Sequence, residues 1–63
     1  MPWIATLAAA LAVDGRALIK LGDRETAAGE LRQAAQLARE HGLPHVLREA
    51  RSAQRGLRLA RAG

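Results

Sequence analysis

Two cations in the first third of the chain have a spacing that could support ligand binding. Arg16 and Lys20 are four residues apart, so on a helix they share one face. Together they could hold a carboxylate, such as a peptide C-terminus or an acidic side chain. Alternatively, both are ordinary solvated cations near a helix end, where Lys20 also suits the negative end of the helix dipole. The spacing leaves both interpretations open.

A stripe of arginine side chains in the last third of the chain is a second candidate site. On a helix it covers roughly 80° of arc and consists of Arg48, Arg51, Arg55 and Arg58. Such a stripe could contact phosphates without reading bases, or it could bind an acidic protein; the alternative is a solvated outer face. A membrane role is not expected, because the opposite face is mostly alanine and lacks aromatic anchors.

The sequence contains no recognisable catalytic or metal site. Ser52 is its one serine and has no neighbouring base in a recognisable arrangement. The absence of cysteine excludes disulfides and thiolate metal sites. His41 and His45 lie on either side of a turn without a suitable carboxylate pair, so we expect no metal site there. We therefore expect a binding protein, not an enzyme, with no cofactor and no small-molecule substrate.

Length and composition limit the hydrophobic core. The chain has 63 residues, and alanine and leucine supply 25 of them. Domains near this size bury only about 60% of the surface that the unfolded chain exposes, and alanine adds little buried area. We therefore expect a marginal monomer, or a chain that covers one face with a partner or a second copy. The single aromatic residue, Trp3, either anchors a partner or covers the end of the core.

The charge is unevenly distributed. The formal net charge is +4, and residues 32–63 carry seven arginines against Glu40 and Glu49. A basic half suggests an acidic partner or nucleic acid, although an arginine-rich solvated face would look the same. The apolar run from Trp3 to Val13 spans 11 residues, short of the roughly 20 needed to cross a bilayer, and no positively charged region of a secretory signal precedes it. We expect a cytoplasmic protein.

Two glycine-marked breaks divide the chain into three expected helices. Gly22 and Gly42 each suit the left-handed position just after a helix. Asp23 is a strong N-cap, and Pro44 fits a first helical position. We predict an all-α, antiparallel three-helix array over about 2–21, 24–41 and 44–60, in a single domain, 1–63.

Each predicted helix has an apolar stripe that we expect to face the core. The stripes are Ile4, Leu7, Leu11 and Leu18 in the first helix, Ala27, Leu31, Ala34 and Ala38 in the second, and Val46, Ala50, Ala53, Leu57 and Ala60 in the third. The alanines in these stripes are small enough to let helix axes approach closely. A glycine inside a helix costs about 1 kcal/mol relative to alanine, so we expect some of Gly15, Gly29 and Gly56 to serve close contacts.

The first two helices and their turn resemble a tetratricopeptide repeat, a helix–turn–helix unit of about 34 residues. With Ala8 at the first repeat position, the family pattern falls on Gly15, Ala17, Leu18, Gly22, Asp23, Ala27, Leu31 and Ala34. Leu11, Asp14 and Arg39 depart from it, replacing a common Trp, an apolar residue and the usual Pro. The longer second helix resembles the degenerate repeats in the helical arms of large bacterial ATPase-type transcription regulators.

The resemblance implies a protein-interaction or oligomerisation module, within or derived from a larger regulator. It maps Ala12, Arg16, Ile19 and Lys20 to the groove-facing wall of the repeat, and it makes the third helix a cap or the start of a further repeat. About three repeats are usually needed for a stable stack, so the chain is either a piece of a longer array or self-associates. The alternatives are a generic three-helix bundle and a small basic protein that binds nucleic acid through the arginine stripe.

Overall fold

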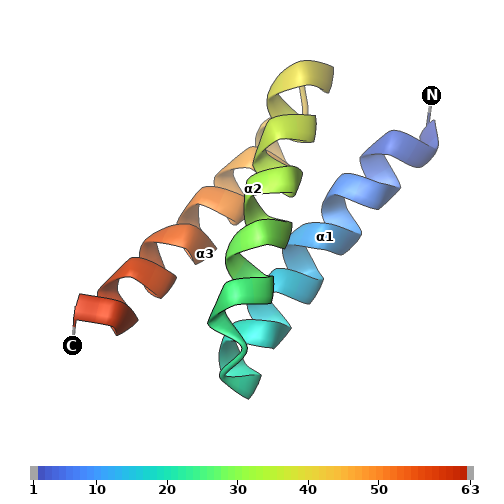
Figure 1. Ribbon diagram of the computed structural model, residues 1–63. Coiled ribbons are helices and arrows are strands. Elements are labelled where there is room, and N and C mark those ends of the chain that lie inside the picture. The colour runs from blue at the N-terminus through green and yellow to red at the C-terminus, as the bar shows by residue number, and fades with distance from the viewer. Residues whose placement is uncertain (1, 63) are drawn as a thin grey trace.

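Three α-helices joined by two tight turns make up the fold (Figure 1). The computed structural model describes the backbone of residues 2–62 and the side chains of residues 3–59. It contains α1 (Pro2–Leu21), α2 (Arg24–His41) and α3 (Pro44–Ala62). The predicted all-α array is confirmed, and α3 runs two residues beyond its predicted end at 60. Residues 60–62 contain neither glycine nor proline, so the sequence has no residue that would end the helix before Ala62.

The two turns form because their glycines adopt the left-handed conformation, with φ of 87° at Gly22 and 64° at Gly42. The next residue then donates its N–H to a carbonyl five residues earlier, at 2.9 Å for Asp23 and 2.8 Å for Leu43. These bonds satisfy carbonyls that the helix end leaves free. The Asp23 side chain also accepts a hydrogen bond from the Thr26 N–H at 3.3 Å, which caps α2. Each turn reverses the chain direction.

The central helix, α2, packs against both of its neighbours (Figure 1). α1 and α2 are antiparallel and in contact, and α3 returns along the other side of α2. The C-terminal half of α3 diverges from α1, which opens a gap between the two helices. The fold measures 39 × 16 × 14 Å. This elongated shape leaves little interior.

The core consists mostly of alanine. Its buried apolar residues are Ala8, Ala12, Ala27, Leu31, Ala34, Ala35, Ala38, Ala50 and Leu57. The stripe predicted for α2 is confirmed in full. The stripe predicted for α1 is wrong at Leu7, which is 39% exposed, whereas Ala8, Ala12 and Gly15 are buried. Close packing puts the smallest side chains at the helix contact and the larger ones at its flanks. In α3, Val46 and Ala53 are half-buried, and the side chain of Ala60 lies outside the described residues.

α1 and α2 approach each other closely at Gly15. A Cβ atom at this position would lie 2.7 Å from both Cγ and Cδ2 of Leu31. Leu31 is the largest fully buried side chain among the described residues. A Cβ at Gly29 or Gly56 would meet nothing within 4 Å. Of the three helical glycines, Gly15 therefore serves the close contact that the sequence led us to expect.

Large apolar side chains are exposed mainly on α1. The exposed ones among the described residues are Trp3, Leu7, Val13, Leu21 and Leu59. Trp3 is 55% exposed, so it covers the end of the core only in part. None of the helices within residues 2–62 combines the length and apolar composition needed to span a membrane.

Candidate protein-binding groove between α1 and α3

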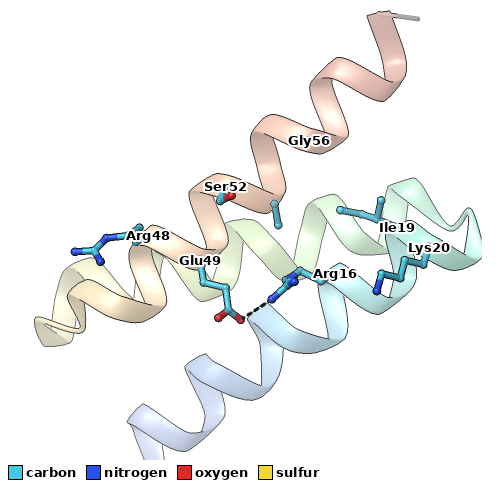
Figure 2. Close-up of a pocket in the computed structure, with 8 residues that line it drawn as sticks. Arg16, Ile19, Lys20, Arg48, Glu49, Ser52 and Gly56 are labelled. Atoms are coloured by element: carbon cyan, nitrogen blue, oxygen red, sulfur yellow. Dashed lines mark ion pairs between the residues drawn. The ribbon is translucent and has the colours of Figure 1, made fainter.

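An open groove lies where α3 diverges from α1, with a volume of about 540 Å³. It is lined by Arg16, Ile19, Lys20, Arg48, Glu49, Ser52, Ala53 and Gly56. Figure 2 shows the labelled side chains on the two facing helices. Of the four residues that the resemblance maps to the groove-facing wall, Arg16, Ile19 and Lys20 lie together on the α1 wall of one groove. The assignment of Ala12 is wrong, because its side chain is fully buried in the core.

The spacing of the lining residues explains how each helix forms its wall. Arg16 lies three and four residues before Ile19 and Lys20, so the three side chains share one face of α1. The α3 wall repeats this spacing from Glu49 to Gly56. Sequence reasoning missed the α3 wall except for Arg48, which it placed in the arginine stripe. The regular spacing of these α3 residues shows that they share one face of the helix. It does not show which face of α3 contacts α1.

An ion pair joins the two walls. Arg16 Nη1 lies 3.9 Å from Glu49 Oε1, and the two side chains are 56% and 39% exposed. Figure 2 shows them pointing toward each other across the groove. An exposed pair at this distance contributes only about 0–1 kcal/mol. A carboxylate from another molecule could therefore replace Glu49 beside Arg16 at little cost.

The remaining lining residues give the groove an apolar base and a positive rim. Lys20 is exposed and makes no ion pair within the described part of the chain. Ile19 and Ala53 are half-buried and supply apolar surface from the two walls. Arg48 extends away from the pair formed by Arg16 and Glu49 (Figure 2). The cations that face a ligand in the groove are therefore Arg16 and Lys20.

Known proteins offer no guide to this groove. Neither a protein-family model, nor a curated protein, nor a solved structure matches the chain. The chemistry of the groove is therefore inferred from its own residues.

The arginine stripe of α3 is exposed along its length, but its members face different neighbours. Arg48 lines the groove with α1. Arg58 lines a hollow of about 270 Å³ together with Arg32 of α2. Arg51 and Arg55 line neither of these cavities. Sequence reasoning missed Arg32, because its proximity to Arg58 depends on how α2 and α3 pack.

A pair of acidic side chains lies between α1 and α2. Glu30 Oε1 is buried. A hydrogen bond with the Asp14 side chain, then burial, then the negative charges of Asp14 and Asp23 raise the pKa of Glu30 above its usual range. The described residues include no group of three or more metal-ligating side chains placed to hold an ion. The pair is a source of repulsion at neutral pH.

Proposed function

We propose that the chain is a protein-interaction module, resembling a tetratricopeptide repeat, that binds a carboxylate-bearing segment of a partner protein. The supporting observation is that Arg16, Ile19 and Lys20 line one open groove opposite α3. The two cations can form charge-assisted hydrogen bonds with a carboxylate, while Ile19 supplies apolar contact. We place the module in the cytoplasm, within or derived from a larger regulator.

In this proposal the Glu49 carboxylate competes with the ligand for Arg16. Its carboxylate already lies beside Arg16 and holds that side chain toward the groove. An incoming carboxylate takes the place of Glu49 and also reaches Lys20, one helical turn further along α1. Removing the negative charge of Glu49 should therefore tighten binding, whereas removing either cation should weaken it.

The direct test is a titration with short peptides. Two pools of random pentapeptides are compared, one with a free C-terminal carboxylate and one with a C-terminal amide, by amide chemical shifts of the labelled protein. The free-carboxylate pool should shift residues of the α1 and α3 walls and bind at least tenfold more tightly. A tenfold difference corresponds to about 1.4 kcal/mol, near the lower end of the range for hydrogen bonds to charged groups.

Matched variants separate the groove from general charge effects. Lys20→Ala and Arg16→Ala should each weaken binding about tenfold. Glu49→Gln should strengthen it. Arg39→Ala removes an exposed cation of α2 that does not line the groove and should leave binding unchanged. Equal binding of the two peptide pools, or equal losses in Arg39→Ala and Lys20→Ala, would refute the proposal.

Nucleic-acid binding through α3 is the second candidate function. The exposed arginines of the stripe favour it, as does the hollow that Arg58 shares with Arg32. Duplex and single-stranded DNA should then bind at low salt, and affinity should fall steeply between about 50 and 200 mM salt. The triple replacement of Arg51, Arg55 and Arg58 by alanine should abolish binding. No binding at low salt eliminates this candidate.

A further inference from the structure

The outer face of α1 carries mainly apolar and small residues at the spacing of a helix–helix contact. Trp3, Thr6, Ala10, Val13, Ala17 and Lys20 recur at steps of three and four residues, which is the seam spacing of a coiled coil. We call this set the α1 seam. All six residues are exposed, Val13 by 58%. The pattern is typical of a helix that packs against a further helix.

The surface along the seam is hollowed by its small side chains. One broad, shallow depression of about 770 Å³ is lined mainly by residues of α1, among them Ala10, Val13 and Asp14, with Val46 of α3 at its edge. A second hollow, of about 200 Å³, is lined by Val13, Arg16, Ala17 and Lys20. The side chains of a second helix lying along α1 would have room in both.

The thin core gives the fold a physical reason to cover this face. Leu31 and Leu57 are the large apolar side chains that the described part of the chain buries, whereas Trp3, Leu7 and Val13 all remain exposed on α1. A chain of this length gains little stability from its own core. Burying the α1 seam would add large apolar side chains to the protected interior.

Charge and symmetry select a second copy of the chain as the occupant. The exposed arginines of α3 make like copies repel on that side, whereas the α1 seam has one charged member, Lys20, at its end. A two-fold axis midway between Ala10 and Val13 sets these two residues against each other. The same axis sets Lys20 of one copy against the Trp3 indole of the other, a favourable cation–π arrangement. The seam is thus complementary to itself when the copies are antiparallel.

We propose that two copies of the chain form an antiparallel, two-fold dimer through the α1 seam. The dimer does not depend on the function proposed for the groove: of the residues that line the groove, Lys20 belongs to the seam and Arg16 borders it, because Arg16 also lines the second hollow. Seam variants are therefore placed at Val13, Ala17, Thr6 and Ala10, none of which lines the groove.

Sedimentation equilibrium across a concentration series tests the dimer. The natural chain should pass from monomer to dimer as concentration rises. Val13→Glu should weaken association at least tenfold. Leu59→Glu is the matched control: Leu59 is 68% exposed on α3, and its change should leave association intact. Circular dichroism of both variants checks that helicity is kept. A chain that stays monomeric throughout, or equal effects of the two variants, would overturn the proposal.

Cysteine cross-linking tests the orientation without weakening the fold. The natural chain has no cysteine, so each introduced thiol is unique. A mixture of Thr6→Cys and Ala17→Cys chains should be joined by a short bismaleimide. Thr6→Cys alone should not, because the two Thr6 positions lie about 16 Å apart along the helix axis at about 1.5 Å per residue. Ser52→Cys on α3 should also stay unlinked. Efficient linking of Thr6→Cys to itself, or of Ser52→Cys, would overturn the antiparallel dimer.

Discussion

Replacing Gly15 by alanine sets helix propensity against packing at a close contact between α1 and α2. An alanine inside a helix is favoured over glycine by about 1 kcal/mol. The new Cβ would lie 2.7 Å from both Cγ and Cδ2 of Leu31, and Leu31 is fully buried, so the clash must be relieved within the core. Overpacking of a core costs about 1–3 kcal/mol. We expect a net loss of about 0–2 kcal/mol in the free energy of unfolding.

The other helical glycines provide matched controls. A Cβ at Gly29 or Gly56 meets nothing within 4 Å, so Gly29→Ala and Gly56→Ala should gain the full propensity term of about 1 kcal/mol. Thermal unfolding followed by circular dichroism measures all three variants at one fixed protein concentration. For a domain of this size, 1 kcal/mol shifts Tm by about 4–8 °C. The two controls should raise Tm, and Gly15→Ala should leave it unchanged or lower it.

A double-mutant cycle attributes the effect to the contact itself. Leu31→Ala removes the two atoms that the new Cβ would meet, so in that background Gly15→Ala should stabilise the chain as the controls do. A rise in Tm for Gly15→Ala equal to that for Gly29→Ala would refute the reasoning. It would mean that α1 and α2 separate without cost.

Two further predictions concern the acidic side chains. Because the pKa of Glu30 is raised in the fold, its carboxyl group stabilises the folded state at acid pH, and this contribution is lost as pH rises through the raised pKa. Glu30→Gln should therefore raise Tm at neutral pH and have a smaller effect at acid pH; equal effects at both would contradict the pairing with Asp14. Asp23→Ala should cost about 1 kcal/mol in urea unfolding by removing the α2 cap, whereas Asp23→Asn should cost little. A similar loss in both variants would argue against the cap.

The three helices and the two turns between them could be predicted because their causes are local. Gly22 and Gly42 end the first two helices through bonds that reach back only five residues, and Asp23 caps α2 through a residue three positions away. The buried stripe of α2 was also predictable, because this central helix packs against both neighbours along its small residues. Arg16 and Lys20 share a face for the same local reason, their spacing along α1.

Contacts between helices were decided by packing. The sequence predicted that Leu7 faces the core. In the structure the close approach of the helices at Gly15 places Ala8 and Ala12 in the core and leaves Leu7 exposed. The same packing brings Glu49 to Arg16 across the groove. A helix forms through hydrogen bonds between residues a few positions apart, which a short stretch of sequence encodes. The relative rotation and crossing of two helices depend on how side chains distant in sequence fit together, and no short stretch contains both surfaces.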